Sequence, residues 1–166
     1  MDILTIASKK NEKFLRTKTK EVDIRALKEL DLPALIRTMK ATMRRADGVG
    51  LSANQIGLDM KLFVAEVSAD TAQGTSKFYA VLNPKIIKME KETNELEEGC
   101  LSVPGIFGPV VRPSKIVIAG FDIKGKPLKL KAWGFLARVF QHEIDHLNGR
   151  LFIDKAKSLH TIAQKK

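Results

Sequence analysis

The sequence predicts an α+β fold for this chain of 166 residues. Two segments show apolar residues at the spacing of amphipathic helices, and four segments are predicted strands, three of them rich in β-branched and aromatic residues. Helices and strands do not alternate regularly, which disfavours a repeated β-α-β arrangement. The length suffices for a hydrophobic core, and no repeat or low-complexity linker divides the chain, so we expect a single domain over residues 1–166.

The first predicted helix runs from about Leu32 to Ala46. Pro33 suits its first turn, and its apolar residues form one stripe, namely Leu32, Leu35, Ile36, Met39, Met43 and Ala46. After this helix, Gly48 and Gly50 flank a single valine. Such a pair is typical of a helix cap with a tight turn, or of backbone that a ligand approaches closely.

The predicted strands follow the first helix. They cover Lys61–Val67, Phe78–Ile87, Lys115–Ile123 and Pro127–Lys131. The segment Ser68–Lys77 is small and polar, so it is interpreted as a surface loop between the first two of these strands.

The second predicted helix spans Trp133 to Leu147, with Gly149 as its C-terminal stop. One stripe of this helix combines apolar residues with imidazoles, namely Phe135, Val139, His142 and His146. Two imidazoles on an apolar stripe are costly to bury unless something satisfies their nitrogens, and a metal ion does so.

The same helix contains a His-Glu-x-x-His motif, formed by His142, Glu143 and His146. One turn of helix brings residues i and i+4 to one face, so both imidazoles can bind one metal ion. Glu143 can then take a proton from a metal-bound water without being a ligand, which points to metal-assisted hydrolysis. The alternative is a pair of ordinary helix histidines among surface acids.

A catalytic site of this kind usually has three protein ligands and one open position. Metzincin proteases take a later histidine, but here that position is Phe152. Thermolysin-like proteases take a later glutamate, yet the only acid after His146 is Asp154. His160 lies in a lysine-rich tail, and we do not expect it to be the ligand. The third ligand is therefore expected upstream of the helix.

Upstream, the chain has one cysteine, Cys100, between Gly99 and the pair Pro104-Gly105. A thiolate is a strong ligand for a divalent transition metal. A lone cysteine that packs as a small hydrophobe is the alternative. Gly99 and a sharp turn at Pro104-Gly105 favour a shaped loop instead, so Cys100 is the candidate third ligand.

Three motifs occur in order along the chain, at Gly48–Gln55, Glu98–Ser102 and Gln141–His146. Their sequences and order resemble the peptide deformylase family, and weaker similarity, such as Leu82-Asn83-Pro84, covers most of the chain. The resemblance implies a peptide-deformylase-like α+β fold, with a central metal-binding helix surrounded by antiparallel β-sheets. It also implies one metal ion per chain, typically Fe²⁺, which Zn²⁺, Ni²⁺ or Co²⁺ can replace.

The resemblance implies a role for each motif residue. Cys100, His142 and His146 hold the metal, and Glu143 acts as general base and then as general acid while a metal-bound water attacks the formyl carbon. The side-chain amide of Gln55 and the backbone N–H of Leu101 stabilise the oxyanion.

The implied substrate is N-formylmethionine at the start of a new polypeptide, and the implied product is formate. The extended peptide pairs with the backbone of Gly48–Gly50, including that of Gly50, like an added strand. An apolar slot for the methionine side chain is lined by Val49, Leu96, Phe135 and Val139. For Arg138, a position bordering this pocket and a salt-bridged or exposed position are both open.

The chain departs from the commonest family pattern at Ser52 and Asn54, where alanine and proline are frequent. We expect these two residues to affect the loop rather than the chemistry. Some members also have an arginine near Phe107 that assists peptide binding, and this chain lacks it there.

Composition bears on location and partners. One cysteine excludes an internal disulfide, and the chain has neither a signal-peptide core nor a membrane-spanning stretch, so we expect a cytoplasmic protein without membrane association. The net charge of +10 indicates affinity for RNA phosphates, but few aromatics and no nucleic-acid motif argue against sequence-specific binding. Docking to the ribosome through basic surface remains a hypothesis.

Two other functions stay open at this point. One is a different metallohydrolase, such as a small endopeptidase, which would cleave an internal bond of an unformylated peptide. The other is a non-enzymatic RNA-binding domain, which would bind no metal and whose activity Glu143→Ala would leave unchanged.

Overall fold

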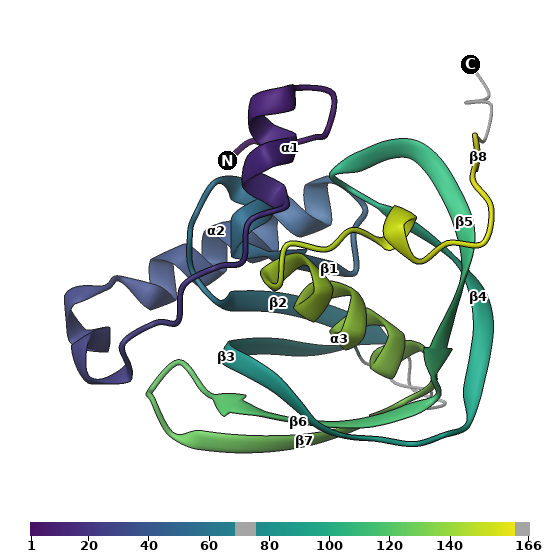
Figure 1. Cartoon of the computed structure of the whole chain (residues 1–166). Coiled ribbons are helices and arrows are strands. Elements are labelled where there is room, and N and C mark those ends of the chain that lie inside the picture. The colour runs from purple at the N-terminus through teal and green to yellow at the C-terminus, as the bar shows by residue number, and fades with distance from the viewer. Residues whose placement is uncertain (69–75, 162–166) are drawn as a thin grey trace.

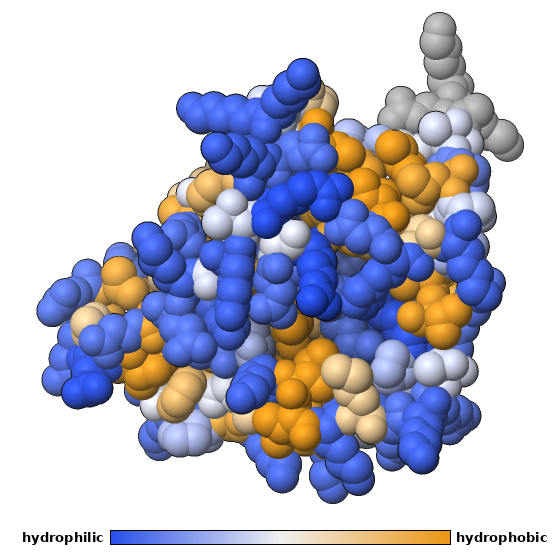
Figure 2. Space-filling view, in the orientation of Figure 1, coloured by the Kyte–Doolittle hydropathy of each residue, from blue (hydrophilic) through white to orange (hydrophobic). Residues whose placement is uncertain are grey.

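The computed structural model describes residues 1–68 and 76–161. Most of the predicted surface loop Ser68–Lys77 lies outside these residues. Figure 2 shows one face of the molecule as largely hydrophilic with separate apolar patches, in keeping with a charged-residue content of 29%. Among the described residues, none of the helices combines the length and the apolarity that a bilayer crossing requires.

The larger of two antiparallel sheets has five strands in the order β1-β2-β3-β6-β7. The strands are β1 (Gly50–Ser52), β2 (Leu62–Ser68), β3 (Ser76–Met89), β6 (Lys115–Phe121) and β7 (Pro127–Trp133). Because β1 is an edge strand of this sheet, one side of its backbone is not paired with another strand of the sheet.

The smaller sheet has the strand order β4-β5-β8. Its strands are β4 (Thr93–Cys100), β5 (Val103–Pro113) and β8 (His160–Thr161). The register between β4 and β5 shifts sharply near the turn, because Cys100 pairs with Val103 whereas Gly99 pairs with Phe107.

The helices are α1 (Lys9–Leu15), α2 (Leu32–Arg45) and α3 (Gly134–Leu147), with 3₁₀ turns η1 (Ile24–Glu29), η2 (Ala53–Ile56) and η3 (Phe152–Asp154). Figure 1 shows α3 in the middle of the molecule, with the larger sheet on one side and β4 and β5 on the other. The central helix expected from the family resemblance is therefore present.

The apolar face of α3 packs on the larger sheet. Phe140 is fully buried, with its ring centroid 5.3 Å from that of Phe63 on β2 and 5.1 Å from that of Tyr79 on β3. Ile116 and Ile118 of β6 belong to the same core. This packing fixes α3 against the sheet and turns its other side, with the two histidines, toward β4.

Both predicted helices are confirmed, and each of the four predicted strands has a counterpart within two residues at either end. The hairpin of β4 and β5 was not predicted, because β4 is rich in acids and lacks a run of β-branched residues. The expected turn at Pro104-Gly105 is wrong, since the chain turns at Leu101–Ser102. Pro104 and Gly105 instead lie in the bulged start of β5, where Gly105 has a φ of 75°.

Candidate metal centre

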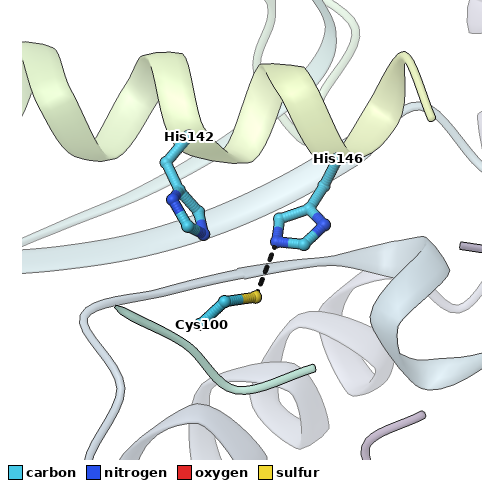
Figure 3. Close-up of side chains that lie close together, drawn as sticks. All are labelled: Cys100, His142 and His146. Carbon is cyan, nitrogen blue, oxygen red and sulfur yellow. Dashed lines mark hydrogen bonds between the residues drawn. The ribbon is translucent and has the colours of Figure 1, made fainter. Parts of the chain in front are cut away.

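Two elements bring three metal-binding side chains together. Helix α3 carries His142 and His146 one turn apart, with their ring centroids 4.9 Å from each other. Cys100 ends β4, and its Sγ lies 3.1 Å from Nε2 of His146. One donor atom from each residue lies within 4.8 Å of the others, and Figure 3 shows the three side chains pointing toward one another.

The electrostatics of this trio suit a cation. Burial raises the pKa of the Cys100 thiol, but the adjacent imidazoles of His146 and His142 outweigh burial and hold that pKa well below its usual value. Burial lowers the pKa of His142, whereas hydrogen bonds with Cys100 and Glu98 raise it more, to about 10. The site thus stabilises positive charge between a thiolate and a carboxylate, and a metal cation meets the same demand.

His146 presents only one of its ring nitrogens to the trio. It is 1% exposed, and its Nδ1 has no hydrogen-bond partner among the described residues. Its Nε2 faces Cys100, so this is the ring nitrogen that a metal ion held by the trio would contact.

Glu98 contacts His142 on the side of its ring opposite to the proposed metal position. One carboxylate oxygen lies 2.9 Å from Nδ1 of His142, which leaves the opposite ring nitrogen for the metal position. The other oxygen accepts hydrogen bonds of 2.5 Å from Nε of Arg112 and 2.7 Å from Nη1 of Arg138. Burial raises the pKa of Glu98, but the hydrogen bonds from Arg112 and His142 lower this pKa by a larger amount, so the carboxylate stays ionised.

The buried charges continue beyond Glu98. Arg112 is 2% exposed and also donates a hydrogen bond of 2.7 Å to Asp145, which accepts from Lys155 at the same distance. Every charge in this chain of contacts therefore has a partner of opposite sign, as buried ions require. Sequence reasoning assigned no role to Glu98, although it lies in the Glu-Gly-Cys motif beside the candidate ligand.

Glu143 lies next to the trio, in contact with β1. It is 4% exposed, and its Oε2 accepts a hydrogen bond of 2.5 Å from the hydroxyl of Ser52. Burial raises the pKa of Glu143, although the two histidines and Ser52 partly oppose the rise. A Cβ on Gly50 would lie 2.3 Å from Oε1 of Glu143, so this glycine makes room for the carboxylate.

Gln55 is held from both ends. Its Oε1 accepts a hydrogen bond of 2.9 Å from the backbone N–H of Ser52, and its Nε2 donates one of 3.1 Å to the hydroxyl of Ser102. The same Nε2 lies 3.7 Å from Sγ of Cys100, so the amide hydrogens point toward the trio.

The contacts of Ser52 and Asn54 extend beyond their own loop, and their effect on the chemistry stays a matter for experiment. Ser52 touches both Glu143 and Gln55. The side-chain amide of Asn54 donates a hydrogen bond of 2.7 Å to the backbone carbonyl of His146. Both side chains are fully buried, and the η2 segment packs directly on α3. These hydrogen bonds therefore connect η2 to the helix that carries the histidines.

A cavity of about 490 Å³ opens beside the trio. The predicted site residues that line it are Val49, Gly50, Gln55, Cys100, Leu101, Phe135, Val139, His142 and Glu143. His146 lies behind them. The structure does not bring Leu96 to the cavity: its side chain is 46% exposed, and the lining of β4 begins one residue later, at Glu97.

The structure also places three other residues considered in the sequence analysis. Arg138 borders the cavity and is also salt-bridged, and it is only 3% exposed. Phe107 lines the cavity. His160, which we did not expect to be a ligand, lies on β8 with Nε2 3.0 Å from a carboxylate oxygen of Glu97.

An α+β fold in which a His-Glu-x-x-His helix and a strand cysteine converge beside an open cavity defines a class, that of metal-dependent hydrolases. Comparison with known proteins then narrows the class. A family model described as polypeptide deformylase matches residues 3–161. The chain belongs to the peptide deformylase family, whose members are metal-dependent hydrolases that remove the formyl group from newly made polypeptides.

Individual relatives agree with this assignment. The chain is 46% identical to a peptide deformylase of Halothermothrix orenii over 155 residues, which cover 93% of this chain and 94% of the relative. The solved peptide deformylase of Thermotoga maritima is 36% identical with a TM-score of 0.81, covering 94% of this chain and 97% of that one. A probable peptide deformylase from Synechococcus phage S-SSM7 is 37% identical with a TM-score of 0.79, covering 93% and 99%.

The resemblance and the fold class inferred from the motifs are thus confirmed. Family membership favours a deformylase over the two alternatives, a small endopeptidase and a non-enzymatic RNA-binding domain. The catalytic roles of individual residues stay predictions.

Proposed function

We propose that this protein removes the formyl group from N-terminal formylmethionine and releases formate, using a metal ion held by Cys100, His142 and His146. The proposal rests on the convergence of these three side chains. Cys100 belongs to the smaller sheet, whereas the helix with both histidines packs on the larger one, so the fold itself brings the three together. A thiolate with two imidazoles suits Fe²⁺, the proposed resident ion, and also Zn²⁺, Ni²⁺ or Co²⁺. Such an ion supplies Lewis-acid polarisation and makes a bound water more acidic.

Glu143 is the proposed general base and general acid. It accepts the proton of the attacking water and then returns it to the leaving amine. Its burial beside the cavity supports this role, because burial raises the pKa of the carboxyl and makes the carboxylate a stronger base. The hydroxyl of Ser52 and the space at Gly50 hold the carboxylate in one orientation.

The oxyanion of the tetrahedral intermediate needs hydrogen-bond donors that are already in position. The amide of Gln55 and the backbone N–H of Leu101 are the proposed donors. Gln55 is held by Ser52 and Ser102, so little reorganisation is needed when negative charge develops. One such donor contributes about 3 kcal/mol to lowering the barrier in a comparable hydrolase site.

The cavity fits a peptide that enters in extended form. Because β1 is an edge strand, the backbone at Gly50 can pair with the substrate as an added strand. Val49, Phe135 and Val139 supply an apolar lining for the methionine side chain. Leu96 is left out of this lining because it lies outside the cavity.

The proposed setting is the cytoplasm, where formylated chains emerge from ribosomes. The net charge of +10 supports loose docking to the ribosome through basic surface, without recognition of a particular RNA sequence.

The test begins with anaerobic purification and metal analysis, followed by assays on formyl-Met and acetyl-Met tripeptides. We expect about one metal ion per chain, rapid loss of formyl and little loss of acetyl. Glu143→Ala should retain the metal and lose nearly all activity. Equal cleavage of formylated and acetylated peptides, or full activity of Glu143→Ala, would contradict the proposal.

A further inference from the structure

The outer face of β6 and β7 carries a regular set of lysines. On β6, Ile116 and Ile118 face the core, so Lys115, Val117 and Ala119 face outward. On β7, Leu128, Leu130 and Ala132 pack against the core, so Lys129, Lys131 and Trp133 face outward. Helix α3 packs on the opposite side of this sheet.

The strand register arranges these side chains in rows. Lys88 of β3, Val117 and Lys131 form one row across the three strands. Lys85 of β3, Ala119 and Lys129 form the next. Within β7, residues i and i+2 are ~6.8 Å apart, and each row spans two strand spacings, or ~10 Å. The lysine face, defined as Lys85, Lys88, Lys115, Lys129, Lys131 and Trp133, therefore presents charges at repeated intervals with small apolar residues between them.

The charges of the lysine face are largely unpaired. Among the residues that the structure describes, only Lys115 of these lysines has an ion-pair partner, Glu90 at 3.5 Å. Trp133 is 67% exposed, the most exposed large hydrophobic residue in the described part of the chain. A shallow groove of about 220 Å³ runs between Trp133, Lys131 and Lys88.

These features select one kind of partner. An evenly spaced polyanion satisfies repeated lysines, and a flat aromatic ring matches an exposed Trp133. RNA offers both in one molecule, whereas an acidic peptide offers no regular stacking partner. A membrane surface would favour several inserted apolar side chains; only Val117 and Ala119 lie within the two rows, although Ile87 and Met89 of β3 are also exposed.

We propose that the lysine face binds the phosphate backbone of RNA, with Trp133 stacked on an unpaired base. The inference deepens the ribosome docking proposed above by naming its surface. It does not depend on the deformylase reaction, since α3 and its histidines lie on the other side of the sheet.

The chain provides its own probe, because Trp133 is its only tryptophan. A single-stranded RNA oligonucleotide, titrated into the metal-loaded protein at low salt, should quench the tryptophan fluorescence. The affinity should fall as salt rises, with a log-log slope of about −0.7 for each phosphate contact. Absence of quenching at low salt would overturn the proposal.

Two variants with the same change in net charge distinguish RNA binding at the lysine face from RNA binding by overall charge. Replacing Lys85, Lys88, Lys129 and Lys131 by glutamine should weaken RNA binding at least tenfold and flatten the salt slope. The control replaces Lys9, Lys10, Lys13 and Lys18, exposed lysines at the N-terminal end, and should lose much less. Equal losses in both variants would mean binding by net charge alone and would refute the proposal.

Two further arms distinguish the partner and the function. Polyglutamate and anionic phospholipid vesicles should quench Trp133 far less than RNA does, and equal quenching by either would overturn the choice of RNA. Both quadruple variants should keep wild-type activity on a formyl-Met tripeptide. A failed deformylase assay with intact RNA binding would refute the proposed function and leave this inference standing.

Discussion

The hydroxyl of Ser52 donates a hydrogen bond of 2.5 Å to Oε2 of Glu143. The backbone N–H of the same residue donates one of 2.9 Å to Oε1 of Gln55. One fully buried serine at the end of β1 therefore orients both the proposed base and a proposed oxyanion donor. Its contacts extend from the edge strand, where the substrate is expected to pair, to the helix that carries the histidines.

Ser52→Ala should lower kcat about tenfold while leaving KM nearly unchanged. The variant keeps the backbone bond to Gln55 but removes the hydroxyl from Glu143, and a hydrogen bond to a charged group contributes about 1.5–3 kcal/mol. Steady-state kinetics on a formylated tripeptide, with metal content checked, measures this effect. Ser114→Ala is the control, because that exposed hydroxyl bonds to the carbonyl of Glu92. An unchanged kcat in Ser52→Ala would show that Glu143 does not need this contact.

Glu98→Gln should weaken metal binding by roughly 10- to 100-fold, the usual effect of losing a group that orients a metal-binding histidine. Glutamine keeps the size of the side chain but removes the negative charge that faces His142, Arg112 and Arg138. Competition with a chromophoric chelator gives the affinity. Glu95→Gln, an exposed acid of the same strand, should bind metal as the wild type does. Equal affinities for all three proteins would argue against an orienting role for Glu98.

Cys100→Ala should abolish stoichiometric metal binding and with it the deformylase activity. The change removes one of the three donors and leaves two, which is too few for a stable catalytic site. Elemental analysis after dialysis provides the measurement. His160→Ala serves as the comparison, since His160 contacts Glu97 and lies apart from the trio. Metal retained in Cys100→Ala but lost in His160→Ala would refute the assigned donor set.

Glu66 should make stability depend on pH in the acid range. Hydrogen bonds of 2.7 Å from Arg44, together with Lys40 at 3.3 Å, lower the pKa of Glu66 to about 2. A carboxyl whose pKa is lower in the folded state stabilises the fold above its unfolded pKa of about 4.3, and this contribution is lost as the pH falls toward 2. Glu66→Gln should therefore unfold at lower urea concentration than the wild type at pH 6.

The same comparison at pH 3 should show a smaller difference between Glu66→Gln and the wild type. Both proteins are measured at equal metal loading, so that proton competition at the metal site affects them alike. Glu29→Gln, an exposed acid without an ion pair among the described residues, should show no such trend. A difference that stays constant from pH 6 to pH 3 would contradict the linkage.

The sequence could predict what depends on local spacing. The positions of His142 and His146 on one face of α3 follow from the helical repeat, and the amphipathic patterns of α2 and α3 specify which faces are buried. The motif order also identified Cys100 as the candidate partner, and the structure brings it to the two histidines. Its role as a metal ligand, like that of its partners, stays a prediction for the experiments above.

Only the tertiary structure decided how distant segments meet. The contact of Ser52 with Glu143 and that of Glu98 with Arg138 join residues 91 and 40 positions apart. Leu96 was also misplaced by sequence reasoning. The part of β4 that lines the cavity begins at Glu97, so Leu96, one residue earlier, lies outside the cavity. Helical neighbours are set by the geometry of one backbone segment, whereas strand register and buried ion pairs depend on the packing of the whole chain.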